Sequence, residues 1–366
     1  MSPTVGDWLR ILDGIFPPAL AEEWDNVGLQ VGDRSWAADG VLVALDPTLG
    51  VVREAVRRDC GMVVTHHPLI FRPLRSLDLD DPTSRIAGEA LSSRVAVAAY
   101  HTNADAARPG VTDALAEVLE LRVTGVLRPS APEDRAKLVT FVPTDATAKV
   151  LDALALSGAG VIGEYTHCSF RVAGTGTFLP SDRAEPAIGE RGELNEVQED
   201  RVEMVLPRAR VEAAIGALIR AHPYEEVAYD VYPLLGGEGL GPGRLAEPED
   251  ELSAAELADR CRGRLGVSVR TAGDLDRRVR TVALCAGAGA SLIPDALRAE
   301  ADAYVTGDLK HHQALDAAAA GLTVIDPGHH GTEWPFVEAL GRVLAWSVPD
   351  ARVFVSETRT DPFDTA

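Results

Sequence analysis

The stretch Gly61–Pro68, with the sequence GMVVTHHP, joins a short apolar run to a pair of histidines. The run from Gly61 to Thr65 has the length of a β-strand, and the amphipathic segment Pro47 to Asp59 before it reads as a helix. Pro68 disfavours helical backbone at His67, so the two imidazoles leave the strand end in extended backbone and splay apart. The stretch therefore predicts a buried strand that ends in two potential metal ligands.

Further apolar runs of strand length lie on both sides of this stretch and alternate with helical segments. In the N-terminal part the predicted strands are 40–46, 61–65 and 95–100, with helices at 4–16 and 47–59. In the C-terminal part the predicted strands are 279–286, 303–306, 322–325 and 352–356, with helices at 291–300, after Lys310 and at 330–345. Such alternation predicts an α/β fold with mainly parallel sheets flanked by helices. Both parts contain a strand that ends in Thr and then paired histidines, which suggests an internal duplication.

The middle of the chain follows a different pattern. Strands are predicted at 138–142, 201–206 and 227–232, a hairpin at 165–171 and 174–179, and helices at 146–156 and 208–222. This βαβ–βαβ order is typical of a ferredoxin-like α+β domain. The flanking segments 129–134 and 235–250 are rich in Pro, Gly and acidic residues, as domain boundaries often are. We predict that residues 1–129 and 249–366 form one α/β core and that residues 130–248 form an inserted domain.

The amino-acid composition indicates which classes of binding partner and which cellular compartment to expect. The 366 residues carry a formal net charge of −21, which argues against a general nucleic-acid or anionic-membrane binder. The N-terminal segment Met1 to Arg10 lacks the basic and apolar regions of a signal peptide, and no apolar run approaches the ~20 residues of a membrane span. The four cysteines, Cys60, Cys168, Cys261 and Cys285, form no C-x-x-C pair and suit a reducing compartment. We expect a cytoplasmic protein.

Seven of the nine histidines lie in four short motifs, each just beyond a predicted core strand. The motifs are His66-His67, His101 with Asp105, His311-His312, and His329-His330 with Glu333. In open parallel sheets the carboxyl ends of the strands form the edge that binds ligands. Histidines that only pack in the core would not be expected repeatedly at this edge. The position of these seven histidines therefore predicts a binding site.

The side chains in these motifs are typical of a divalent-metal site. His329 and Glu333 are four residues apart, so on a helix they share one face and can grip one ion. The carboxylate of Asp105 is able to bridge two cations and offset their charge. Imidazole and carboxylate ligands without thiolate suit Zn, Mn, Fe or Co rather than Ca. The natural chemistry of such a site is hydrolysis by a metal-activated water.

Other residues leave two readings open. His101 is either a proton carrier, our one candidate catalytic residue, or a hydrogen-bond partner of Asp105. The pair His311-His312 either lines the same cavity or lies on a solvated helix N-terminus. The turn 287–291 either cradles an anion or only joins a strand to a helix. Trp24-Asp25-Asn26 forms either a cavity wall or a turn.

Several motifs together resemble one family. They are EWDNVGL at 23–29, THHPLIF at 65–71, YHTN at 100–103 followed by Asp105, TGD at 306–308 followed by His311-His312, and GHHGTE at 328–333. In these motifs the chain resembles the Nif3-like dinuclear metal-centre proteins, also called GTP cyclohydrolase 1 type 2 homologues. The segment HPYEEVAYD at 222–230 is similar to the CutA/PII-like insert of the longer bacterial members.

The resemblance implies a two-lobed core, interrupted by the insert, that assembles into a toroidal homohexamer. It also implies two divalent ions per chain, held by His66, His67, Asp105, His329 and Glu333, and it selects His329 over His330. Two functions remain open. One is a metal-dependent hydrolase of the GTP cyclohydrolase type, acting on a nucleotide or related small molecule. The other is a non-catalytic, hexameric metal-binding or ligand-sensing regulatory protein.

Overall fold

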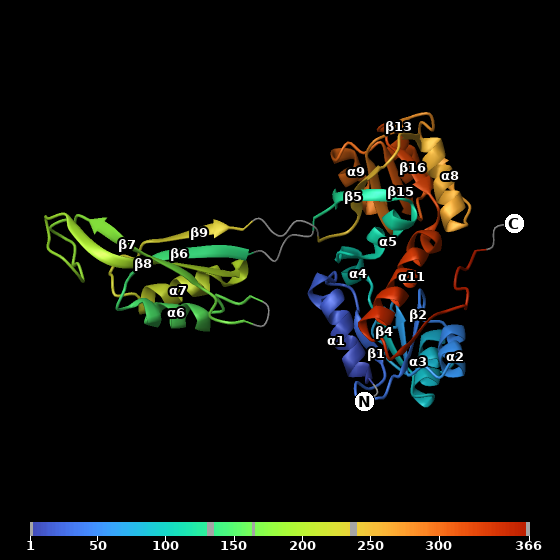
Figure 1. Ribbon diagram of the computed structural model, residues 1–366, viewed down its shortest axis with the longest axis horizontal. Coiled ribbons are helices and arrows are strands. Elements are labelled where there is room, and N and C mark those ends of the chain that lie inside the picture. Colours follow the sequence, from blue (N-terminus) through green and yellow to red (C-terminus); the bar gives the residue numbers. More distant parts are fainter. Residues whose placement is uncertain (1–2, 130–134, 163–164, 235–239, 364–366) are drawn as a thin grey trace. The chain divides into compact units, whose positions relative to one another are not determined.

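The computed structural model describes residues 3–129, 135–162, 165–234 and 240–363. The chain divides into two compact units (Figure 1). The first unit joins Met1–Ser130 to Glu238–Ala366, and the second is Ala131–Gly237. None of the helices in the described ranges combines the length and the apolar character needed to cross a bilayer.

The first unit contains a five-stranded sheet in the order β1-β4-β3-β2-β17. Its strands are β1 (Gly28–Val31), β2 (Gly40–Ala44), β3 (Met62–Thr65), β4 (Ala96–Ala99) and β17 (Arg352–Val355). The neighbours pair in parallel except for β1, which is antiparallel to β4. Around it lie α1 (Val5–Ile15), η1 (Pro18–Leu20), α2 (Leu49–Arg57) and α3 (Pro82–Ser92).

Alternate side chains of this sheet enter two separate apolar clusters, because successive residues of a strand face opposite sides. Val41 and Val43 join the cluster that contains α1, whereas Leu42 and Ala44 join the cluster that contains α2 and α3. Both faces of β2, β3 and β4 are therefore buried, which explains why these strands read as continuous apolar runs in the sequence.

A six-stranded sheet in the order β12-β16-β15-β14-β10-β5 forms the other half of this unit. Its strands are β5 (Leu121–Val126), β10 (Arg244–Pro248), β12 (Arg270–Ala272), β14 (Val282–Ala288), β15 (Ala303–Gly307) and β16 (Thr323–Asp326). Beside it lie the short strands β11 (Leu252–Ser253) and β13 (Arg278–Val279), and the helices α4 (Thr102–Ala106), α5 (Val111–Val118), α8 (Ala254–Leu265), η3 (Ala290–Leu292), α9 (Ile293–Arg298), α10 (His311–Ala319) and α11 (His329–Ser347).

Only β14, β15 and β16 pair in parallel in this second sheet; its other pairings are antiparallel. The predicted mainly parallel arrangement therefore does not extend to the whole sheet. The chain runs out along β5 before the second unit and returns antiparallel along β10 after it. Residues 244–248, which the sequence assigned to the insert, thus form a strand of the first unit.

The helix α11 packs where the two sheets meet. Its Phe336, Val337, Leu340 and Leu344 belong to one apolar cluster with Val41 of β2 and with residues of β14 and β15. Figure 1 shows this helix running between the strands of the two halves. One continuous core thus fixes α11 against both sheets, which positions the first turns of the helix.

The buried carboxylate of Glu54 on α2 holds the segment that follows β17. It accepts hydrogen bonds from the hydroxyls of Ser356 and Thr358, both at 2.7 Å, and from the backbone N–H groups of Glu357 and Thr358. The Arg58 guanidinium lies 3.0 Å from the same carboxylate. Glu54 is 3% exposed, so hydrogen bonds from the protein replace those of water.

The second unit is an antiparallel sheet in the order β7-β8-β6-β9 with two helices. Its elements are β6 (Arg135–Pro143), α6 (Thr147–Leu156), β7 (Phe170–Phe178), β8 (Asn195–Pro207), η2 (Arg208–Arg210), α7 (Val211–Ala221) and β9 (Tyr229–Pro233). Leu154 of α6 and Leu218 of α7 pack with Leu138 and Met204 of the sheet in one apolar cluster.

The predicted hairpin at 165–171 and 174–179 is wrong. Residues 170–178 form the single strand β7, which pairs along its whole length with β8. Gly174, at the start of the second predicted strand, has ordinary strand backbone and pairs with Glu199. The element order β-α-β-β-α-β is nevertheless the predicted one.

Candidate metal centre

Strands from both sheets of the first unit bring their carboxyl ends to one cluster of histidines and carboxylates. Its members are His66, His67, His101, Asp105, His329 and Glu333. The first two follow β3, the next two follow β4, and the last two lie in the opening turns of α11, just after β16. The local fold at each strand end thus gathers residues that are far apart in the sequence.

Glu333 presents a different carboxylate oxygen to each of two sets of side chains. Its Oε1 lies 3.5 Å from Nε2 of His66. Its Oε2 lies 3.1 Å from Nε2 of His67 and 3.1 Å from Nε2 of His329. Because Glu333 is only 4% exposed, protein atoms supply nearly all of its surroundings.

Asp105 adds a second carboxylate on the His66 side of the cluster. Its Oδ1 lies 3.9 Å from Nε2 of His66, and the imidazole of His66 is fully buried. Burial raises the pKa of Asp105 despite the nearby imidazole. This carboxylate is therefore placed where a nearby positive charge would stabilise its ionised form.

A hydrogen bond to the far nitrogen of each ring orients these imidazoles. Nδ1 of His67 lies 2.7 Å from Asp46 Oδ1, and Nδ1 of His329 lies 2.8 Å from Asp308 Oδ2. Nδ1 of His66 lies 2.9 Å from the carbonyl oxygen of Tyr100. These acceptors require a proton on Nδ1, so each Nε2 turns toward the cluster as a free lone pair in the neutral ring.

The cluster consequently contains acceptors that face one another. Nε2 of His67 and Nε2 of His329 are 3.3 Å apart, and both are close to Glu333 Oε2. Among the described residues, His66 Nε2 and Glu333 Oε2 are buried atoms without a hydrogen bond. Buried lone pairs at such distances repel one another unless a proton or a metal cation lies between them. Nε2 of His67, Nε2 of His329 and Oε2 of Glu333 thus form a triangle with sides of 3.1–3.3 Å. A cation that makes bonds of ~2.0–2.2 Å would fit between these three atoms.

The charges of the cluster shift the pKa values of its members. Burial disfavours the charged form of His67, but hydrogen bonding to Asp46 and Glu333 outweighs it and raises the pKa to about 10. Glu333 and, to a smaller extent, Asp308 raise the pKa of His329 to about 9 although burial opposes them. The site therefore holds protons in the absence of a metal, and a metal that binds must displace them.

His101 lies beside His66 and His67 and is held by Asp25. The three imidazoles offer nitrogen atoms that lie within 4.8 Å of one another. A second group consists of ring nitrogens of His67 and His329 and a carboxylate oxygen of Glu333, which are equally close. Nδ1 of His101 lies 3.0 Å from Asp25 Oδ1, and the backbone N–H and the hydroxyl of Thr102 donate to Oδ2. The Trp24 indole, 58% exposed, lies 6.1 Å from the His101 ring, so this motif forms a wall beside the cluster.

Gly287, at the end of β14, leaves the space that the Glu333 side chain occupies. A Cβ added there would lie 2.2 Å from Glu333 Oε1, and the backbone has a φ of +65°. This contact explains the glycine in the turn 287–291, a role that the sequence alone did not suggest. Sequence reasoning did not single out Asp46, and it quoted Asp308 only as part of the motif TGD. Each aspartate stands just after a core strand, and that position was the available signal.

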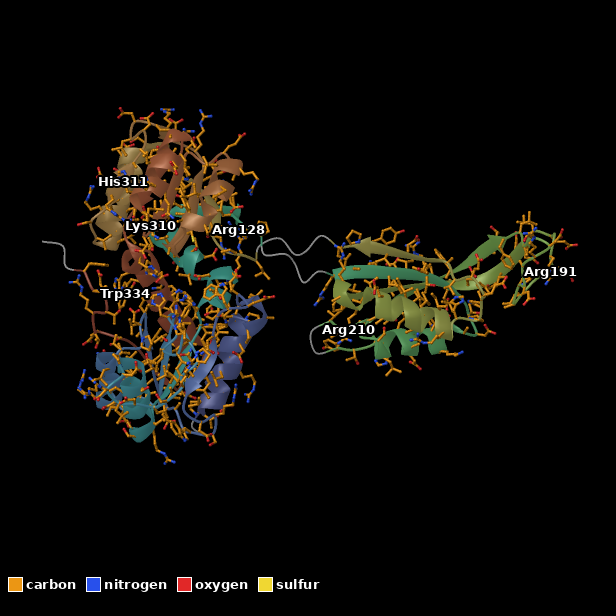
Figure 2. The ribbon with its side chains drawn as sticks, turned by 180° about the vertical axis from the view of Figure 1, so that it is seen from behind. Arg128, Arg191, Arg210, Lys310, His311 and Trp334 are labelled. Atoms are coloured by element: carbon orange, nitrogen blue, oxygen red, sulfur yellow. The ribbon has the colours of Figure 1, made fainter. Side chains whose placement is uncertain are left out.

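The remaining histidines lie elsewhere. His311 and His312 are exposed at the start of α10, as Figure 2 shows for Lys310 and His311, and neither joins a metal-ligand group among the described residues. His330 stacks on the Trp334 ring at 5.3 Å instead of joining the cluster. In the second unit, His222 Nε2 donates to the carbonyl oxygen of Phe141, and His167 is exposed.

The fold and this cluster define an α/β protein with a candidate metal centre at the carboxyl ends of its strands. The sequence profile of the Duf34/NIF3 (NGG1p interacting factor 3) family matches residues 3–362. The chain belongs to this family, as its motifs predicted.

Relatives and solved structures extend this similarity over nearly the whole chain. A Bacillus subtilis protein called GTP cyclohydrolase 1 type 2 homolog is 42% identical over 361 residues, covering 97% of this chain and 96% of its own. The crystal structure of a Bacillus cereus protein related to NIF3 is 38% identical with a TM-score of 0.73, and covers 100% of both chains. A Staphylococcus aureus crystal structure is 30% identical with a TM-score of 0.80, and also covers 100% of both chains.

Proposed function

We propose that the protein binds two divalent metal ions that share Glu333. His66, Asp105 and Glu333 Oε1 hold one ion, and His67, His329 and Glu333 Oε2 hold the other. The observation that carries this proposal is the division of the Glu333 oxygens between two sets of imidazoles. A carboxylate that bridges two cations is typical of dinuclear sites, and this ligand set suits Zn, Fe, Mn or Co.

The reaction class that this site supports best is hydrolysis of a small molecule. Two divalent ions here would lower the pKa of a water between them and polarise the scissile group. His101, held by Asp25, lies beside both sets of ligands and is placed to accept or return a proton. The exposed Trp24 ring, 5.8 Å from Phe71, offers an aromatic surface for a planar group. Together with the name of the relatives, this surface favours a nucleotide or related substrate.

A second candidate function is ligand sensing without catalysis. The observation that favours it is a large cavity in the second unit, residues 131–237, apart from the metal centre. In this reading the unit is a CutA/PII-like insert in a toroidal homohexamer, as the family resemblance implies. We place either form of the protein in the cytoplasm, which agrees with four free cysteines, of which Cys60 and Cys261 are buried.

Metal analysis and a turnover screen test both functions. Elemental analysis of the metal-saturated protein should give about two ions per chain, as a dinuclear site requires; a value of one would contradict the dinuclear assignment. Protein loaded with Zn, Mn, Fe or Co is then screened against nucleotides and phosphoesters beside the double variant His66→Ala/Glu333→Ala. Turnover that the variant loses supports the hydrolase, whereas tight metal uptake without turnover by any loaded form supports the sensor.

A further inference from the structure

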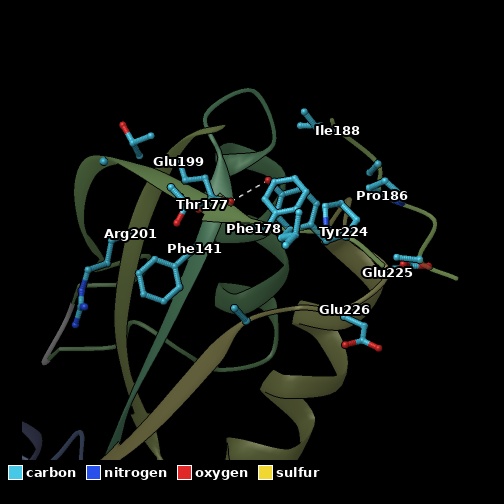
Figure 3. Close-up of a pocket in the computed structure, with 18 of the residues that line it drawn as sticks. Phe141, Thr177, Phe178, Pro186, Ile188, Glu199, Arg201, Tyr224, Glu225 and Glu226 are labelled. Atoms are coloured by element: carbon cyan, nitrogen blue, oxygen red, sulfur yellow. Dashed lines mark hydrogen bonds between the residues drawn. The ribbon is translucent and has the colours of Figure 1, made fainter. Parts of the chain in front are cut away.

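The second unit contains a cavity of about 1140 Å³ that the metal centre does not use. The volume lies just above the range of roughly 300–1,000 Å³ that is usual for small-molecule sites, so the cavity has room for such a ligand. Its walls come from β7 and β8, from the loop 179–188 and from the segment 224–228, all within one unit. Figure 3 shows these elements around the cavity.

Aromatic and apolar side chains form one end of the cavity. The rings of Phe178 and Tyr224 are 6.4 Å apart with an angle of 51° between their planes. Pro186 and Ile188 of the loop lie on the same side of the cavity in Figure 3. Because aromatic faces carry negative charge density, they attract flat rings and cations.

The carboxylate of Glu199 lies beside these rings with one oxygen unused. Tyr224 donates its hydroxyl to Oε1 at 2.8 Å, and burial together with Glu199 raises the pKa of Tyr224, so the hydroxyl stays protonated. Within the described part of the chain, Glu199 Oε2 accepts no hydrogen bond. It lies against Gly176, where an added Cβ would be 2.0 Å away. Glu199 is 9% exposed, and only one of its two carboxylate oxygens accepts a hydrogen bond from the protein. The other oxygen can therefore accept a hydrogen bond from a ligand.

The charges that line the cavity favour a cation. The lining includes three carboxylates and two guanidinium groups, so negative charges outnumber positive ones. The carboxylates belong to Glu199, Glu225 and Glu226, and the guanidinium groups to Arg183 and Arg201. Arg201 is already paired with Glu203 at 3.0 Å and lies over the Phe141 ring, so its charge is largely compensated. The net charge of −21 on the chain adds a long-range attraction for positive ligands.

We propose that this cavity binds a small organic cation with a flat aromatic body, that is, an aromatic amine. The ammonium group donates to Oε2 of Glu199, and the ring lies against Phe178 and Tyr224. A charge-assisted hydrogen bond in a partly buried site supplies the specificity, and the aromatic contacts supply the apolar area. Since the metal centre takes no part in it, this site does not depend on the metal-binding hydrolase proposed above, and it would supply the ligand site of the alternative sensor.

Three indole probes that differ only in their end group test the proposal on the full-length protein. Tryptamine carries an ammonium, tryptophol a hydroxyl and indole-3-acetate a carboxylate. Isothermal titration should show tryptamine binding about tenfold or more tightly than tryptophol, and indole-3-acetate most weakly. Equal affinity for all three, or no tryptamine binding at millimolar concentration, would overturn the proposal.

Substitutions in and near the cavity test whether tryptamine binds there. Glu199→Gln should remove the tenfold preference for tryptamine, whereas Glu196→Gln, three residues earlier on β8 and outside the cavity wall, should retain it. Gly176→Ala offers a second disruption, because its Cβ displaces Glu199 Oε2 without removing the charge. Tryptamine binding that survives both Glu199→Gln and Gly176→Ala would place the amine elsewhere and contradict the assignment.

Discussion

Two regions of the first unit each bury a glutamate, and they surround it in opposite ways. Glu54 is 3% exposed and Glu333 is 4% exposed. Glu54 receives hydrogen bonds from two hydroxyls and two backbone N–H groups. The nearest partners of Glu333 are imidazole nitrogens that already have their proton on the far side of the ring. The first carboxylate has a full set of donors within the chain, whereas the second faces nitrogens that donate to it only when the rings carry a second proton.

The pKa values do not separate these two carboxylates. Burial opposes ionisation of Glu54, but the N–H and hydroxyl donors outweigh it and lower the pKa to about 2. Burial also opposes ionisation of Glu333, and the charge of His66 and the neighbouring imidazoles hold its pKa well below the usual range. The identity of the neighbouring atoms, donor or acceptor, therefore indicates function better than the pKa does.

The largest expected effect is the loss of metal in Glu333→Gln. The amide has one oxygen in place of two and no negative charge, so at least one proposed ion loses a ligand, both lose the shared charge, and metal affinity should fall about 100-fold or more. Competition with a chromophoric chelator measures this affinity. Glu54→Gln is the matched control and should bind metal like wild type. Equal metal binding by Glu333→Gln and wild type would contradict the bridging role.

Next in size are the aspartates that orient the imidazoles. Asp46→Asn and Asp308→Asn each remove the carboxylate that fixes Nδ1 of a proposed ligand, His67 or His329. Affinity for one of the two ions should fall roughly 10–100-fold while the other ion stays bound. Elemental analysis at limiting metal should then give about one ion per chain. Retention of two tightly bound ions in both variants would show that the aspartates do not act on the metals.

A moderate effect on stability is expected at the other carboxylate. Glu54→Gln should lower the free energy of unfolding by about 1–3 kcal/mol, because it leaves buried donors without an anionic acceptor. Denaturant titration near pH 7 measures this change. Because the folded pKa is depressed, the stabilisation is complete above the unfolded pKa of about 4.5 and is lost as the pH falls toward about 2. Wild type and variant should therefore converge in stability over that range; a constant difference down to pH 2 would exclude ionisation as its source.

The smallest effect is expected for His311→Ala/His312→Ala. Both imidazoles are exposed and neither belongs to a candidate metal group in the described ranges. The double variant should keep wild-type metal content, with stability within about 0.5 kcal/mol. A drop in metal content would show that this exposed pair of histidines binds metal. Facing buried acceptors, which Glu333 has and Glu54 lacks, would then not be required for a metal site.

These two histidine pairs also show what the sequence predicted and what it did not. Thr65-His66-His67 and Thr306 followed by His311-His312 look alike, yet only the first pair enters the cluster. His66 follows Thr65 directly, whereas the four residues 307–310 lie between Thr306 and His311, so Asp308 reaches the site and the histidines fall on α10. A difference of a few residues at a strand end decides which side chain is delivered.

Predictions succeeded where the pattern was local and strong. The buried parallel strands were placed within a few residues, because burial on both faces produces continuous apolar runs. The antiparallel strands β1, β5, β10 and β12 were not predicted, because they are short or only partly buried. The cavity in the second unit depends on how a loop lies across β7 and β8, and no periodic signal encodes that packing.

The pairing of β17 with β2 constrains how the protein is made. Strand β17 joins a sheet whose other strands come from residues 28–99. Strand β5, which precedes the second unit, lies in a sheet whose other strands all follow that unit. During synthesis the N-terminal half therefore emerges with an open sheet edge and without His329 and Glu333. The first unit can close only after β17 has been made, and the second unit, residues 131–237, is free to fold earlier as a separate domain.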